Sequence, residues 1–258
     1  MFTRAATGGT PSAGVAAGLA AALVLAAAGC QSDLPAPADP VIAREWVEAS
    51  ARYHDPAGRY TAFAATLEVE TRAPGAAAGY VNEVYLDRAR DTFRRRIDAG
   101  GFPLTQTVGP ASGCAATWPK PDATEEQRLR NGLLGDPCRY IAWRRDYYTW
   151  LVGLPMSALE GEVGFGLLGE TEAFGATCVE VELAIPDAPG GPTWYLYVDR
   201  ETHRLVASRF ASAPGAGEWL HYPGLTDFDG YRLKARTDWY RADARTPIVR
   251  DTLRYARL

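Results

Sequence analysis

Residues 194–210, WYLYVDRETHRLVASRF, carry the pattern that decides the fold. Apolar and aromatic side chains fill 194–198 and return in 205–210, and the segment between them is polar. Two such runs joined by a short polar turn predict an antiparallel β-hairpin. The connection is too short for the helical crossover that a parallel βαβ unit needs.

The same pattern of strand and turn extends in both directions from this hairpin. The further predicted strands are 63–70, 80–87, 92–98, 179–185, 219–222, 231–240 and 248–255. In 231–240, alternation places Tyr231, Leu233 and Trp239 on one face and Lys234 on the other. Roughly 9–11 strands in sequence order predict a mainly antiparallel α+β domain built as a meander.

Helices are predicted at two places. Asp39-Pro40 supplies an N-cap and a proline at the first helical position, and the helix over 40–54 carries Ile42, Trp46 and Tyr53 at helical spacing. Two more helices are expected in the middle of the chain, from about Thr124 and over 137–152.

The aromatic density of 140–150 is the strongest signal inside the domain. Trp143, Tyr147 and Trp150 share one face of the predicted 137–152 helix. One interpretation is a core helix packed on the sheet, and the other is a lid whose aromatic wall contacts a hydrophobic ligand. The two interpretations are compatible.

The N-terminus predicts export and a lipid anchor. An apolar segment over 15–28 is too short to span a membrane. Gly29 and Cys30 follow its last residue, Ala28. This resembles a bacterial lipobox and implies a signal peptide over 1–29 with lipidation of Cys30. Gln31 follows Cys30, which favours the outer membrane, facing the periplasm, in a cell with two membranes. Residues 30–39 form a Pro-rich tether and 40–258 a single domain.

Two motifs resemble hairpins of the LolA/LolB-like fold found in periplasmic lipoprotein carriers. They are Tyr195–Leu205, with Asp199 and Thr202 at the turn, and Asp227–Leu233, with an Asp-Gly turn. The resemblance implies an unclosed antiparallel half-barrel over 40–258, whose apolar concave face is covered by helices. It also implies binding of acyl chains, with no catalytic residues.

The sequence contains few residues that would support catalysis or metal binding. The formal charge is −4, which gives no reason to expect nucleic acid as a partner. The three histidines, His54, His203 and His221, show no metal-ligand spacing, so no metal and no cofactor are expected. His54-Asp55 fits a helix terminus better than a base and its orienting acid.

Cysteine positions predict one disulfide in the exported chain. Cys114 and Cys138 lie in loop-rich sequence that flanks the first middle helix, whereas Cys178 begins a strand. We therefore expect a Cys114–Cys138 bridge and a free, buried Cys178.

The function expected from these patterns is a lipid-anchored envelope protein that binds an acyl chain, lipid or lipoprotein in a half-barrel. Arg95, between Phe93 and Ile97, could reach the cavity and pair with a carboxylate or an anionic lipid head. The cavity candidates are Phe63, Leu67, Arg95, Trp143, Tyr147, Trp150, Leu233 and Trp239. The alternatives are a structural or interaction module with a filled core and, third, an envelope hydrolase.

Overall fold

The computed structural model describes residues 39–76, 79–98, 103–111, 113–117, 136–186, 193–211 and 217–258. The predicted signal peptide, Cys30 and the helix expected from about Thr124 lie outside these residues. Within them, no helix combines the length and apolar character needed to cross a membrane.

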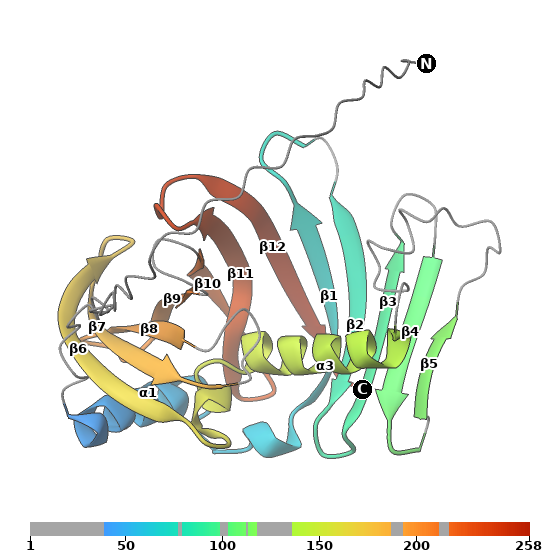
Figure 1. Ribbon diagram of the computed structural model, residues 1–258, viewed down its shortest axis with the longest axis horizontal. Coiled ribbons are helices and arrows are strands. Elements are labelled where there is room, and N and C mark those ends of the chain that lie inside the picture. Colours follow the sequence, from blue (N-terminus) through green and yellow to red (C-terminus); the bar gives the residue numbers. More distant parts are fainter. Residues whose placement is uncertain are drawn as a thin grey trace, which may run out of the picture. The chain divides into compact units, whose positions relative to one another are not determined.

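Twelve antiparallel strands form one sheet, in the order β5-β4-β3-β2-β1-β12-β11-β10-β9-β8-β7-β6 (Figure 1). Their bounds are β1 Ala64–Arg72, β2 Tyr80–Asp87, β3 Thr92–Asp98, β4 Pro103–Gly109, β5 Gly113–Thr117, β6 Gly164–Ala173, β7 Ala176–Ala184, β8 Thr193–Asp199, β9 Leu205–Ala211, β10 Glu218–Phe228, β11 Tyr231–Arg241 and β12 Pro247–Ala256.

The strand order consists of two meanders joined at the centre. The chain runs outward from β1 to the edge strand β5, starts again at the opposite edge with β6, and returns to β12, which pairs with β1. Since β5 and β6 are the two ends of the sheet, it stays open. The expected unclosed half-barrel is confirmed, with twelve strands instead of 9–11, because β4, β5 and β6 lack a clear alternating pattern.

Alternation along the central strands defines the inner face of the sheet. On β1, Ala65, Leu67 and Val69 are buried, whereas Glu68 on the opposite face is exposed. The inner face of β3 carries Phe93 and Ile97 in the same way. Burial of one face explains why the register is well defined.

The described residues also form four helical segments: α1 Pro40–His54, η1 Tyr60–Ala62, α3 Pro137–Gly153 and η2 Met156–Leu159. The capping predicted for α1 is confirmed, because the Asp39 carboxylate accepts a hydrogen bond from the Ile42 amide, 3.1 Å away. The buried stripe of α1 is Ala43, Val47, Ser50 and His54, one position beyond the predicted stripe. Small residues in this stripe let α1 lie close to β6, β7 and β8.

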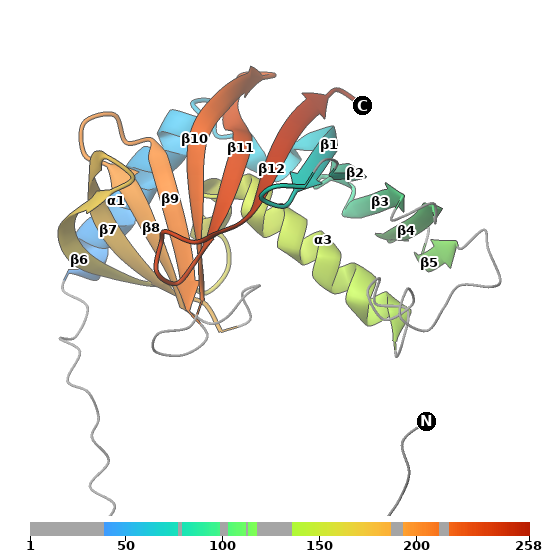
Figure 2. The same ribbon diagram turned by 90° about the horizontal axis from the view of Figure 1, so that it is seen from above.

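Helix α3 crosses the inner face in front of the central strands (Figure 1), and Figure 2 shows it running alongside β1–β5. Its two faces belong to different core clusters. On one face, Tyr148 and Val152 pack with Phe63, which precedes β1, and with Leu67 and other residues of β1–β3.

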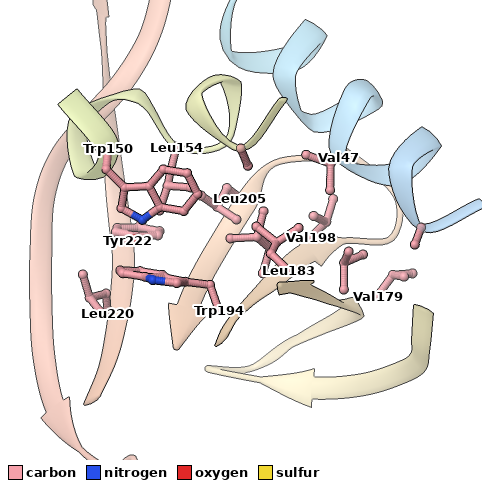
Figure 3. Close-up of a cluster of buried hydrophobic side chains, with 14 of the residues drawn as sticks. Val47, Trp150, Leu154, Val179, Leu183, Trp194, Val198, Leu205, Leu220 and Tyr222 are labelled. Atoms are coloured by element: carbon pink, nitrogen blue, oxygen red, sulfur yellow. The ribbon is translucent and has the colours of Figure 1, made fainter. Parts of the chain in front are cut away.

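The C-terminal end of α3 enters the second cluster, between α1 and strands β7–β11. Trp150 lies edge-on to Trp194, with ring centroids 5.5 Å apart, and Leu154 packs nearby (Figure 3). Val47 of α1 reaches the same cluster from the other side. Helix α3 is therefore held on two faces, by Tyr148 and Val152 on one and by Trp150 and Leu154 on the other.

Candidate functional site

A pocket of about 260 Å³ lies between α3 and the inner face of the six strands β1–β3 and β10–β12. Helix α3 forms one wall with Arg144, Tyr147, Tyr148, Leu151 and Val152. The opposite wall is the sheet where its two meanders meet. The pocket thus occupies the position that the half-barrel resemblance implies for a ligand.

Much of the pocket surface is aliphatic and aromatic. The aliphatic side chains on the sheet are Val69, Leu220, Ile248, Val249 and Leu253. Tyr222 and Trp239 add aromatic surface from β10 and β11, facing the tyrosines of α3. Pockets lined by apolar and aromatic side chains with a few placed polar groups are typical of small-molecule sites.

The acids of the pocket are Asp251 and Glu218. Toward the ends of β1 and β12, Asp251 accepts hydrogen bonds from Thr71 Oγ1 at 2.6 Å and Trp239 Nε1 at 2.8 Å. Burial raises the pKa of Asp251, and these two bonds partly offset the rise. Burial also raises the pKa of Glu218. Both shifts reduce the tendency of the pocket's acids to ionise.

Arg95 faces the pocket from β3, as predicted, and only 4% of its surface is exposed. Its Nε donates to Asn82 Oδ1 at 2.9 Å, and Nη1 donates to Gln106 Oε1 at 3.2 Å. Both acceptors are neutral amides. No carboxylate in the described part of the chain pairs with this guanidinium, so its charge is buried without an acidic partner.

The pocket also contains Lys234, which the alternation of 231–240 assigned to the outer face. A bulge at Ala235 corrects that prediction: Leu225 pairs with Lys234, whereas Gly224 pairs with Arg236. The side chain is 3% exposed and its Nζ donates to the Leu151 carbonyl oxygen at 2.6 Å. A sequence signal did exist, because Lys234 is one of two lysines among 27 basic residues.

Of the eight predicted cavity residues, Arg95, Tyr147 and Trp239 line this pocket. Phe63, Leu67 and Leu233 instead pack in the core cluster beneath α3. Trp150 belongs to the other cluster, and Trp143 is 40% exposed, with its ring 5.4 Å from that of Tyr147. The structure therefore brings three candidates together in the pocket and places the rest elsewhere.

The predicted disulfide is confirmed. Cys114 on β5 bonds to Cys138 in the first turn of α3, with their Cα atoms 5.6 Å apart. Cys178 is free and fully buried, and burial raises the pKa of its thiol to about 11. The bridge fixes the N-terminal end of α3 to an edge of the sheet. The far end of the helix wall is therefore held covalently.

The three histidines make hydrogen bonds or ring contacts within the fold. His54 Nδ1 donates to the Arg232 carbonyl oxygen at 2.6 Å, and the Leu205 amide donates to Nε2 at 3.1 Å. Burial lowers the pKa of His54 to about 3, which keeps the ring neutral. His203 packs on Trp46, and His221 stacks on Phe174 with ring centroids 4.2 Å apart. Among the described residues, no three His, Cys, Asp or Glu side chains group as metal ligands.

No family model and no curated protein sequence matches this chain. Solved structures with a similar fold include a LolA superfamily protein from Nitrosomonas europaea, 15% identical, covering 82% of this chain and 91% of its own, with a TM-score of 0.49. A DUF1329 family protein from Desulfovibrio piger is 9% identical, covering 84% and 92%, with a TM-score of 0.44.

A Vibrio parahaemolyticus domain described as an outer membrane lipoprotein-sorting protein is 12% identical, covering 83% of this chain and 93% of its own, with a TM-score of 0.44. These similarities are low. The assignment of the half-barrel rests on the strand order and on the open edges at β5 and β6.

Proposed function

We propose that this protein is a lipid-anchored component of the bacterial envelope that binds a hydrophobic ligand between α3 and the sheet. The observation that carries the proposal is the pocket itself. A structural module with a filled core would pack α3 against β10–β12, whereas here about 260 Å³ remains open under the helix. The ligand would gain affinity from burial of apolar surface.

The rest of the proposal comes from the N-terminal sequence. Lipidation of Cys30 would hold the domain at a membrane, and Gln31 favours the outer membrane of a cell with two membranes. The protein would act by binding and not by catalysis, with the membrane as its first partner. We also propose that binding requires neither a metal nor a cofactor.

The proposal is tested by titrating the Cys30→Ala chain with an uncharged, single-chain fluorescent probe. Leu253→Trp should fill the pocket from β12 and weaken probe binding at least tenfold, which corresponds to about 1.4 kcal/mol. Thr252→Trp is the matched control, because neighbouring side chains on a strand point to opposite faces. It should leave probe binding unchanged.

Two results would contradict the proposal. The first is a folded wild-type chain that shows no saturable probe binding at micromolar protein concentrations. The second is equal weakening by Leu253→Trp and Thr252→Trp, which would place the probe outside the pocket. Either result would favour the structural module.

A further inference from the structure

Lys234 is a buried amine that has no acidic partner among the residues the structure describes. Its ammonium carries three donors, and the Leu151 carbonyl oxygen accepts one of them at 2.6 Å. The face of the Tyr222 ring lies against it, with Nζ 4.7 Å from the ring centroid. No carboxylate oxygen of the described residues lies within 4.0 Å of Nζ.

The acids of the pocket do not compensate this amine. Asp251 directs its oxygens to Thr71 and Trp239, as described above. Burial lowers the pKa of Lys234 well below its ordinary value, and within the described ranges no acid counteracts this shift. An uncompensated buried cation costs desolvation energy, which a bound anion would offset.

The backbone turns Lys234 into the pocket by a specific feature. On a regular strand it would share the outer face with Arg232 and Asp238. The extra residue at Ala235 interrupts the regular pairing locally, and a β-bulge of this kind redirects a side chain. Bulges occur next to functional sites for this reason, so the inward position of Lys234 is a built feature of β11.

We infer that the pocket binds one single-chain carboxylic amphiphile, such as a fatty acid, with its carboxylate on Lys234 Nζ and its chain along Leu220, Val249 and Leu253. This deepens the proposed function and rests on it. The volume, about 260 Å³, lies just below the roughly 300–1,000 Å³ typical of ligand pockets and suits one chain.

Lys234 is assigned the head group in preference to Arg95. The guanidinium of Arg95 already donates to two amide oxygens, those of Asn82 and Gln106, whereas the ammonium of Lys234 donates to a single carbonyl. The two cations also lie apart, because β2, β1 and β12 separate β3 from β11. A single carboxylate can therefore bind only one of the two cations, and Lys234 is the one with free donors.

The test compares dodecanoic acid with dodecanol as competitors of the uncharged probe, using the full Cys30→Ala chain purified without detergent. The two ligands share a chain and differ in the head group. The wild type should bind the acid about ten- to hundredfold more tightly than the alcohol, as expected for a hydrogen bond between charged groups. This comparison requires no substitution at Lys234.

Lys234→Met then identifies the group responsible. It should remove the preference for the acid and leave the affinity for the alcohol within about threefold, because methionine keeps the length and loses the charge. Arg96→Met is the control, because Arg96 is exposed on the opposite face of β3. This substitution removes the same net charge as Lys234→Met. It should preserve the preference.

The outcomes separate the two proposals. If the probe itself does not bind, the proposed function fails and the present inference fails with it. If the alcohol binds as tightly as the acid, only the carboxylate is excluded and the hydrophobic pocket stands. If Arg95→Met removes the preference and Lys234→Met keeps it, the assignment to Lys234 is overturned.

Discussion

At the scale of single residues, His54 shows how a buried ring joins distant segments. It accepts from the Leu205 amide and donates to the Arg232 carbonyl, so the end of α1 is tied to β9 and β11. The ring is 1% exposed. Only the neutral form can make both bonds, because a protonated ring has no acceptor.

The low pKa of His54 predicts acid-dependent unfolding. Its pKa is about 3 in the folded chain against 6.5 for the free side chain, so the stabilisation is complete above 6.5 and is lost as the pH falls toward 3. By about pH 4 the loss should reach roughly 3 kcal/mol. Urea unfolding of the wild type and His54→Gln at several pH values measures it. Equal losses in both proteins would contradict this role.

Two tryptophans of α3 should differ in their contribution to stability. Trp150 is 8% exposed and packs on Trp194, so Trp150→Ala should lower the free energy of unfolding by about 3–5 kcal/mol. Trp143 is 40% exposed, so Trp143→Ala should change it by less than about 1 kcal/mol. Chemical denaturation measures both, and similar effects would show that the core position of Trp150 is wrong.

Residue patterns predicted the inner face correctly at Arg95 and incorrectly at Lys234. Arg95 follows the alternation of β3, which has no irregularity in its pairing with β2. Lys234 precedes a bulge, which redirects a side chain locally while Leu233 and Trp239 keep the predicted face. Alanine at 235 gives no sign of a bulge in the sequence, so the inward lysine could not be predicted from alternation.

At the scale of elements, α3 is the part of the fold on which the pocket depends. Its N-terminus is capped by Asp136, whose carboxylate accepts from the Cys138 amide at 2.9 Å, and is bonded to β5 through Cys114. Its C-terminal end is anchored among the residues around Trp194. The helix is thus held at both ends while its middle forms the pocket wall.

Breaking the disulfide should loosen α3 at one end. The cysteines are 24 residues apart, and in the loop-entropy account the bridge contributes about 3 kcal/mol. Cys114→Ser with Cys138→Ser should therefore lower the free energy of unfolding by about that amount and speed amide exchange in the first turns of α3. Unchanged stability and exchange would mean that the bridge does not hold the helix.

Elements with clear periodicity were predicted, and those without it were missed. The helices at 40–54 and 137–152 and the alternating strands agree with the structure. β6 contains Gly164, Gly166 and Gly169, with an irregularity in its pairing between Leu167 and Gly169, so its sequence shows no alternation. The short strands β4 and β5 lie in a segment rich in turn residues, which hid them.

At the scale of the whole domain, the pocket forms where the two meanders join. Its sheet residues come from β1–β3 and from β10–β12, segments far apart in sequence that the pairing of β1 with β12 brings together. The eight candidates from sequence were chosen by local pattern, and five of them lie elsewhere. Tertiary pairing of this kind cannot be read from local periodicity.

The anchor predicts where the protein is found in the cell. The wild type should partition with membranes and into the detergent phase of a detergent split, because acyl chains on Cys30 would contribute about 0.8 kcal/mol per buried methylene. Cys30→Ala should move to the soluble fraction. Cell fractionation followed by immunoblotting measures this, and a wild type already in the aqueous phase would contradict lipidation.

The central claim, a pocket that takes one hydrophobic chain, is tested most directly by native mass spectrometry of the Cys30→Ala chain. Added dodecanoic acid should give one adduct per chain, and Leu253→Trp should abolish that adduct while Thr252→Trp keeps it. A folded wild type that remains at its bare mass with excess acid would contradict the claim, as would an adduct that survives in Leu253→Trp.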